Sequence, residues 1–285
     1  NSQKLLMPAS TNKLYTCAAA FHFLKKHHQF KTDVLSNKKN LVLKGGGDPD
    51  LSIKELDSLA LEVSKKYKNI DTLFIDDTFL DSLNYGEGWM WDEGPWWYAA
   101  PISALTVNDN CIDFYIKPST IGKAASIDYY PKTSFIKFKN ASMTVQDSVL
   151  KKLKIDRDWV LNKNTFYAYG ELIDTADVDT LYRNIYNPST FTGIVFKESL
   201  ERFGTKVKTI SRKKPFNKSY KKISNHLSKP LLHSAINLMN ESDNLTAELF
   251  VKSIGALDTL PGTWKVGLDS IKSFLAKEVL IDTSN

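Results

Sequence analysis

A serine and a lysine near the start of the chain have the spacing of a nucleophile and the base that activates it. Ser10 and Lys13 are three residues apart in the segment 6–14. At the start of a helix, residues three apart lie on one face, so the amine sits one turn from the hydroxyl. An amine held there can accept the serine proton and leave a nucleophilic oxygen. The pair therefore predicts acyl-transfer chemistry without a histidine.

The residues around Ser10 distinguish it from several other Ser-x-x-Lys matches in the sequence. Residues 14–24 are almost entirely apolar, which predicts a central, buried helix. This helix should begin near Pro8, because proline is tolerated in the first turn of a helix. The helix N-terminus would stabilise the negative charge of an oxyanion. The alternative interpretation is that Ser10 is an ordinary N-cap and Lys13 an ordinary lysine of the first turn.

A second polar tripeptide, Ser242-Asp243-Asn244, lies between two predicted helices. Residues 228–241 have the apolar spacing of a helix, and another helix is predicted to start within the tripeptide. A short polar loop of this kind can project a hydroxyl and an amide into a cleft. The alternative is that the tripeptide only caps the following helix.

Together these motifs resemble those of the D-alanyl-D-alanine carboxypeptidase/endopeptidases, the class C low-molecular-mass penicillin-binding proteins. The matching segments follow the order of that family along essentially the whole chain. They are Pro8–Lys13, Gly45–Pro49, Gly88–Pro101, Glu241–Glu248 and Pro261–Trp264.

The resemblance implies a role for each polar residue of the two motifs. Ser10 would be acylated by peptidoglycan stem peptides ending in D-Ala-D-Ala, and by β-lactam antibiotics. Lys13 would take its proton, Ser242 would pass a proton to the leaving D-alanine, and Asn244 would hold Lys13 and the substrate amide. The backbone N–H of Ser10 would form half of the oxyanion hole. No cofactor or metal is implied, and the location would be the bacterial periplasm or cell envelope.

Residues 88–98 contain four of the six tryptophans of the chain, around Asp92 and Glu93. Aromatic rings beside carboxylates suit a ligand that carries an ammonium group. The resemblance implies that Glu93 and Tyr98 hold the far end of the diamino-acid side chain of the peptide, although the family often has Asp at the position of Glu93. The alternative is a loop that is packed by its own aromatic side chains.

The resemblance also implies a third motif, Lys-Thr-Gly, on a strand that lines the other side of the cleft. This tripeptide does not occur in the sequence. We therefore expect the sequence to be truncated at both ends relative to the family, without a signal peptide. We also expect it to be a weak or inactive catalyst as it stands, because the third motif would bind the substrate carboxylate.

The predicted fold is a multi-domain α/β fold, in which a penicillin-binding transpeptidase/β-lactamase-like domain is interrupted by a large insertion. The outer domain is assigned to residues 1–35 and 220–285. The β-rich α+β insertion of one or two domains is assigned to residues 36–219. Within it, helices are predicted at 52–66 and 192–203, and strands at 40–43, 73–75, 111–116, 126–130 and 135–138.

Composition excludes several other classes of protein. The chain has 285 residues, and its net charge of +6 comes from scattered lysines without a nucleic-acid-binding motif. No apolar run is long enough for a transmembrane helix. Cys17 and Cys111 are predicted to be buried thiols, and the five histidines lack metal-ligand spacing. A β-lactamase is disfavoured by the large insertion. The remaining alternative is a non-catalytic relative that binds cell-wall peptide.

Overall fold

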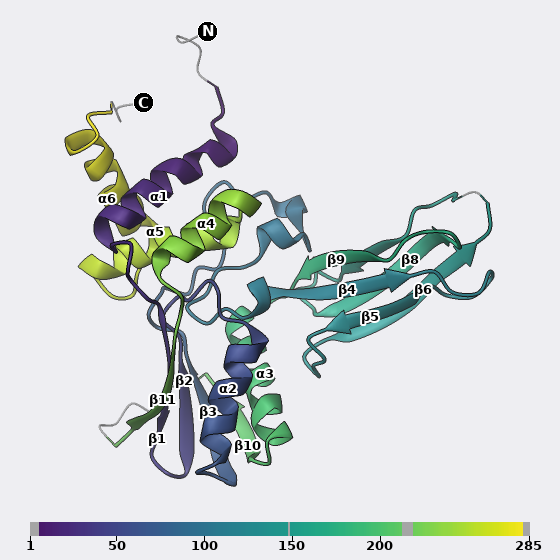
Figure 1. The fold of residues 1–285 in the computed structure, drawn as a ribbon, viewed down its shortest axis with the longest axis horizontal. Coiled ribbons are helices and arrows are strands. Elements are labelled where there is room, and N and C mark those ends of the chain that lie inside the picture. The colour runs from purple at the N-terminus through teal and green to yellow at the C-terminus, as the bar shows by residue number, and fades with distance from the viewer. Residues whose placement is uncertain (1–5, 148, 213–218, 282–285) are drawn as a thin grey trace.

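The protein is divided into three regions, seen in a computed structural model that describes residues 6–147, 149–212 and 219–281. The first is a helical region built from both ends of the chain (Figure 1). It consists of α1 (Asn12–Phe23), α4 (Leu231–Glu241), α5 (Asn244–Asp258) and α6 (Trp264–Lys277).

The second region is an α/β layer below these helices in Figure 1. Its five-stranded sheet has the order β10-β3-β2-β1-β11, in which β2, β3 and β10 are parallel and β1 is antiparallel to both of its neighbours. Helices α2 (Ile53–Ser64) and α3 (Pro188–Arg202) pack together beside the sheet. The strands are β1 (Lys31–Ser36), β2 (Asn40–Lys44), β3 (Asn69–Asp76), β10 (Lys206–Ser211) and β11 (Lys221–Leu227).

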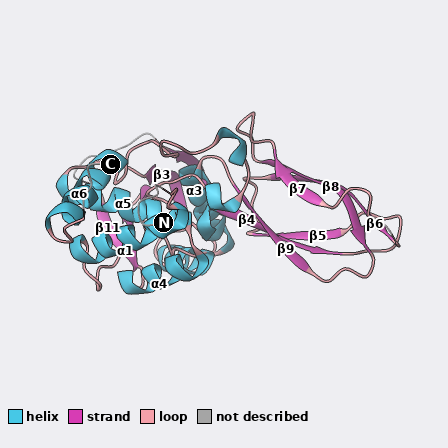
Figure 2. Ribbon diagram, turned by 90° about the horizontal axis from the view of Figure 1, so that it is seen from above, coloured by secondary structure: helices cyan, strands magenta, loops and turns pink. Residues whose placement is uncertain are grey.

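The third region consists of two three-stranded sheets that project from the rest of the molecule (Figures 1 and 2). One sheet is antiparallel, with the order β5-β4-β9, and the other has the order β6-β8-β7. Its strands are β4 (Cys111–Lys117), β5 (Ser126–Tyr130), β6 (Lys137–Val145), β7 (Lys154–Arg157), β8 (Thr165–Ile173) and β9 (Asp179–Asn184). We call it the β region.

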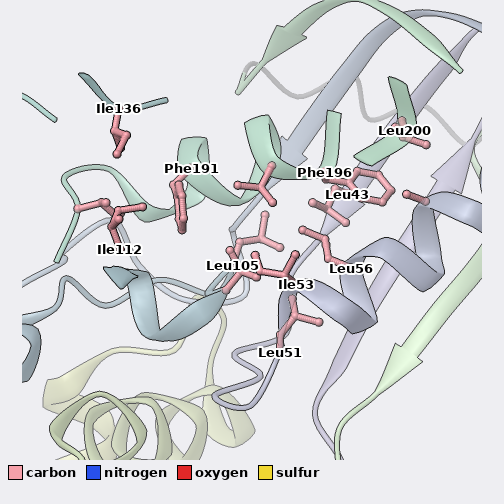
Figure 3. Close-up of a cluster of buried hydrophobic side chains, with 14 of the residues drawn as sticks. Leu43, Leu51, Ile53, Leu56, Leu105, Ile112, Ile136, Phe191, Phe196 and Leu200 are labelled. Carbon is pink, nitrogen blue, oxygen red and sulfur yellow. The ribbon is translucent and has the colours of Figure 1, made fainter. Parts of the chain in front are cut away.

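One hydrophobic core joins the α/β layer to the β region. Figure 3 shows Leu56 of α2 and Phe196 of α3 close to Leu43 of β2, while Ile112 and Ile136 continue the cluster toward the β region. Burial of each such side chain contributes about 1.5–3 kcal/mol. A separate cluster, which includes Phe250, holds α1, α4, α5 and α6 together. The predicted multi-domain α/β fold is confirmed.

The structure tests the predicted starts of helices α2 and α3 and the predicted burial of helix α1. Helix α2 starts at Ile53, directly after its N-cap Ser52, which forms a capping box with Glu55. Helix α3 starts earlier than predicted, because Asn187 caps it and Pro188 occupies its first position. The prediction that α1 is buried on all sides is wrong. It packs against α4, α5 and α6, while Leu14 and Tyr15 on its remaining face are 57% and 43% exposed.

The edges predicted for the insertion fall at two strands that pair with each other. Residue 35 lies inside β1 and residue 220 directly precedes β11, and Lys31 of β1 is opposite Leu227 of β11. We propose that the insertion includes both strands, because the predicted boundaries would separate β1 and β11 from β2, β3 and β10 of the same five-stranded sheet. The division into domains itself stays a prediction.

A buried carboxyl group lies in the Gly-Asp-Pro turn after β2. Asp48 is 1% exposed, and its Oδ1 accepts a hydrogen bond from the backbone N–H of Asp50. Its Oδ2 has no hydrogen-bond partner among the described residues and lies 3.5 Å from Nε2 of His226 on β11. Burial, together with the charges of Asp50 and Glu55, raises the pKa of Asp48 to about 7.

We expect Asp48→Asn to flatten the pH dependence of stability. The folded state binds the Asp48 proton more tightly than the unfolded state, so the wild-type protein should lose stability as pH rises from about 4 to about 7. The asparagine keeps an acceptor for Asp50 and avoids this loss, which amounts to about 4 kcal/mol at most. Urea unfolding at about pH 5 and about pH 8 measures it.

Asp71→Asn is the control for this prediction. Asp71 is exposed, and its hydrogen bond from Lys208 lowers its pKa, so it stays ionised between about pH 5 and about pH 8 and its removal should leave the difference in stability between these two pH values unchanged. An Asp48→Asn protein with the same pH dependence as the wild type would contradict the prediction.

Candidate active site

The first turn of α1 brings Ser10 and Lys13 into contact. A 3-10 turn over Ala9–Thr11 carries Ser10 directly ahead of α1, and Lys13 is the second residue of the helix. Nζ of Lys13 lies 3.0 Å from Oγ of Ser10. The predicted one-turn spacing of nucleophile and amine is therefore present, with the serine in a 3-10 turn instead of the α-helix proper.

A tight corner between α4 and α5 supplies the other side chains of the site. Ser242 ends α4 in a left-handed conformation, with φ of 55°. Asp243 then caps α5 by accepting hydrogen bonds from the N–H groups of Leu245 and Thr246. The predicted capping role thus belongs to Asp243, which leaves Ser242 and Asn244 free to face Lys13.

The other three predicted polar residues, Ser10, Ser242 and Asn244, meet at the amine of Lys13. Its Nζ lies 2.8 Å from the backbone oxygen and 3.1 Å from Oγ of Ser242, and 2.5 Å from Oδ1 of Asn244. The hydroxyl of Ser242 also donates to Oγ of Ser10 at 2.9 Å. The structure therefore joins both hydroxyls and the amide to one amine, in a closed network.

Burial changes the proton affinity of this amine. Lys13 is only 8% exposed, whereas Ser10 is exposed. Desolvation lowers the pKa of Lys13, and the charges of Asp243 and Glu248 partly oppose that shift. A neutral amine at the same 3.0 Å could accept the hydroxyl proton of Ser10. The site thus combines an accessible nucleophile with a desolvated base.

One face of α5 connects this cluster to the segment before β4. Nδ2 of Asn244 donates to the backbone oxygen of Tyr98 at 2.8 Å. One turn later, Glu248 accepts from the Trp264 indole at 2.6 Å. A further turn on, the buried Lys252 donates to Asp81 and to the backbone oxygen of residue 83, both at 2.6 Å. The helix that carries Asn244 thus also fixes the segment that contains Tyr98.

We call residues 85–101 the aromatic loop, which Asn84 and Ile102 close at its base through two hydrogen bonds. The loop joins the Ser10 network through its backbone at Tyr98, whose ring is partly exposed and stacks on Trp96. Asp92 is exposed and Glu93 is half-buried. Neither carboxylate forms a hydrogen bond or ion pair with another described residue, so the structure does not bring them into the network.

Two cavities flank Ser242. The smaller, of about 230 Å³, is lined by Ser10, Lys13 and Ser242 together with Thr11, Leu14, Leu238 and Met239. The larger, of about 370 Å³, lies on the side of Asp243 and is lined by acidic and aromatic side chains that include Asp109, Asp113, Trp97 and Tyr182. Desolvation and the charges of Asp243 and Asp113 raise the pKa of Asp109 to about 7.

Sequence reasoning missed the acidic cavity. Asp109 and Asp113 lie at the start of β4 and have no spacing that connects them with Asp243. Their partner residues come from distant parts of the chain, so only the fold brings the three carboxyl groups to one cavity.

Cys17 and Cys111 are free and buried, as predicted. Within residues 6–147, 149–212 and 219–281, no three His, Cys, Asp or Glu side chains are grouped to hold a metal ion. In the same described segments, none of the helices has the length and apolar character needed to span a bilayer.

Known proteins resemble the chain over nearly all of its length. The D-alanyl-D-alanine carboxypeptidase of Actinomadura sp. (strain R39) is 31% identical over 290 residues, which cover 95% of this chain and 54% of that protein. The D-alanyl-D-alanine carboxypeptidase DacB of Haemophilus influenzae is 26% identical, over 98% of this chain and 60% of that protein. The chain thus spans little more than half the length of the relatives it matches.

The fold has a counterpart among solved structures. The crystal structure of penicillin binding protein 4 (dacB) from Haemophilus influenzae matches with a TM-score of 0.81 and 24% identity, covering 98% of this chain and 64% of that one. The model of the D-Ala-D-Ala carboxypeptidase 3 (S13) family matches residues 1–285. The chain whose Ser10, Lys13, Ser242 and Asn244 form this network therefore belongs to the D-Ala-D-Ala carboxypeptidase 3 (S13) family.

Proposed function

We propose that the full-length protein containing this chain is a serine-type D-Ala-D-Ala carboxypeptidase/endopeptidase that acts on peptidoglycan stem peptides. The observation that carries the proposal is the contact of Nζ of Lys13 with Ser10, Ser242 and Asn244, all within 3.1 Å. The family match and the names of the relatives support it.

The first step is acylation of Ser10. Nζ of neutral Lys13 takes the hydroxyl proton while Oγ of Ser10 bonds to the carbonyl carbon of the penultimate D-alanine. The electron pair of the carbonyl moves to its oxygen, where the N–H of Ser10 is one expected donor. The C–N bond then breaks as the proton passes from Lys13 through the hydroxyl of Ser242 to the leaving nitrogen. The 3.1 Å and 2.9 Å contacts of Ser242 support this path.

The second step releases the product. A water molecule gives its proton to the neutral Lys13 and attacks the ester carbon, and Ser10 leaves with a proton returned from Lys13. In an endopeptidase reaction the leaving amine belongs to a crosslinked peptide instead of free D-alanine. Asn244 contributes by holding Lys13 through Oδ1, while its Nδ2 faces the backbone of Tyr98.

For substrate recognition we propose Glu93, Tyr98 and Asp92 as the residues for the diamino-acid end of the peptide. Their position on the aromatic loop, whose backbone joins Asn244, supports the assignment. The acidic cavity beside Asp243 adds negative charge on the same side and so favours a cationic substrate group. The corresponding location is the bacterial periplasm or cell envelope, where peptidoglycan is found.

The same site should accept β-lactams. A structure of the Haemophilus influenzae penicillin binding protein 4 is a complex with a β-lactam, and its fold matches this chain with a TM-score of 0.74. A non-catalytic peptide-binding relative is the less favoured alternative. Binding alone does not need a desolvated lysine in contact with an exposed serine.

We expect benzylpenicillin to acylate the full-length protein once, at Ser10. Mass spectrometry of the intact protein and of its peptides should show one adduct in the peptide that contains Ser10, because this hydroxyl lies 3.0 Å from the buried amine at the start of α1 and accepts a hydrogen bond from Ser242. Ser10→Ala should remove the adduct, while Ser36→Ala, at a Ser-x-x-Lys match outside the site, should keep it. An unmodified Ser10 in the folded full-length protein would overturn the proposed function.

The acylation rate should rise with pH as Lys13 loses its proton, with a midpoint below the usual lysine pKa because burial favours the neutral amine. Asp243→Asn keeps a helix cap but removes a negative charge that raises the pKa of Lys13, so the midpoint should move to lower pH. Stopped-flow acylation across a pH series measures it. Asp269→Asn, an exposed change on α6, should not move the midpoint, and an unmoved midpoint in Asp243→Asn would contradict the assignment.

A further inference from the structure

An asparagine of the β region is the main hydrogen-bond donor to the aromatic loop. Asn184, the last residue of β9, is fully buried. Its Nδ2 lies 3.0 Å from the backbone oxygen of Gly94, 2.8 Å from that of Trp96 and 2.9 Å from that of Ala99. Its backbone N–H donates to Pro95 at 2.9 Å. One side chain therefore faces three carbonyls of a loop that has little regular structure.

A buried arginine orients this asparagine. Nη2 of Arg157, at the end of β7, donates to Oδ1 of Asn184 at 3.1 Å, which directs the amide nitrogen toward the loop. Arg157 is 4% exposed, and its Nε has no hydrogen-bond partner among the described residues. Burial of an incompletely bonded guanidinium is unfavourable for folding. A role in orienting Asn184 would account for this unfavourable burial.

Two further contacts come from the same region. The guanidinium of Arg183 stacks on the ring of Trp96, with its carbon 4.4 Å from the ring centroid. The ring of Trp159 packs so closely on Gly94 that a Cβ there would lie 2.9 Å from it, and Gly94 has a positive φ of 51°. The conformation of the loop near Glu93 is thus set by the β region.

These contacts form a continuous path from the insertion to the amine of Lys13. Arg157 binds Asn184, which binds the carbonyl of Ala99, and the adjacent carbonyl of Tyr98 binds Asn244. Asn244 in turn accepts from Lys13. Displacement of the loop would therefore move Glu93 and Tyr98, while Lys13 keeps its contacts with Ser10 and Ser242.

We propose that Asn184, oriented by Arg157, is a positioning residue that fixes the aromatic loop for recognition of the side chain of the substrate peptide. The inference rests on the proposed function, because it assigns the loop to the same site. It gives the inserted β region a role in that site. Asn184 touches no reacting atom and acts through the loop backbone.

The test uses Asn184→Asp in the full-length protein. The substitution keeps the shape and the acceptor for Arg157 but places an oxygen opposite three carbonyls, so it removes the donor that faces the loop. Asn140→Asp is the matched control, since Nδ2 of Asn140 also donates to a backbone oxygen, that of Ala125, elsewhere in the β region. Arg157→Gln is a second variant that weakens the orientation of Asn184 without changing Asn184 itself.

The kinetic measurement compares two acylating substrates. One is a stem peptide that ends in D-Ala-D-Ala and carries a diamino acid with a free side-chain amine, and the other is benzylpenicillin, which lacks that side chain. Asn184→Asp should raise KM for the peptide by about tenfold, equivalent to about 1.4 kcal/mol, while the rate of penicillin acylation changes by less than about threefold. Arg157→Gln should act in the same direction, and Asn140→Asp should resemble the wild type. Equal losses toward both substrates, or an unchanged KM, would overturn the inference.

Hydrogen exchange of the same proteins separates this inference from the proposed function. Amides in residues 85–101 should exchange faster in Asn184→Asp and Arg157→Gln, whereas those of α1 and α5 should not change. If the wild type is neither acylated nor active on the peptide, the proposed function fails. Hydrogen exchange in residues 85–101 then decides by itself whether Asn184 positions the loop. Unchanged exchange in the loop would refute the positioning role in either case. An Asn184→Asp protein without a cooperative unfolding transition would not be folded. In that case the substrate comparison and the hydrogen exchange of Arg157→Gln decide.

Discussion

The amine of Lys13 is the point on which the arrangement of the site depends. It is buried, and it contacts oxygens of Ser10, Ser242 and Asn244, which belong to the two ends of the described chain. An amine in this position must satisfy its hydrogen bonds within the protein, because little water reaches it. The corner between α4 and α5 therefore has to lie against the start of α1, and the core around Phe250 holds these helices in that arrangement.

The aromatic loop links this helical site to the inserted regions. It is held from one side by Asn244 of α5 and from the other by Asn184 of the β region, while Lys252 of α5 binds the segment just before the loop. Because most of these bonds go to backbone carbonyls, they specify the path of the loop and leave its side chains available. A loop without regular hydrogen bonding can in this way present aromatic and acidic groups at a defined place.

Local sequence signals predicted those parts of the fold that depend on neighbouring residues. The spacing of apolar residues located α2, and their alternation located β4 and β5. The same reasoning was wrong for α1, since its composition could not tell which face would meet α4, α5 and α6. Strands β1 and β7 to β11 were not identified, and among these β7, β9 and β10 are short or partly exposed, with weak apolar alternation.

The sequence by itself determined which residues could react. A Ser-x-x-Lys pair at a helix start and a Ser-x-Asn at a helix corner can be recognised from residue type and spacing alone. Only the tertiary structure decided that Ser10, Ser242 and Asn244 meet at the amine of Lys13, that Asp109 and Asp113 share a cavity with Asp243, and that Asn184 holds the aromatic loop. The physical reason is that these contacts join residues far apart in the chain, often through backbone carbonyls. Every residue has such a carbonyl, so no sequence pattern marks the one that is bound.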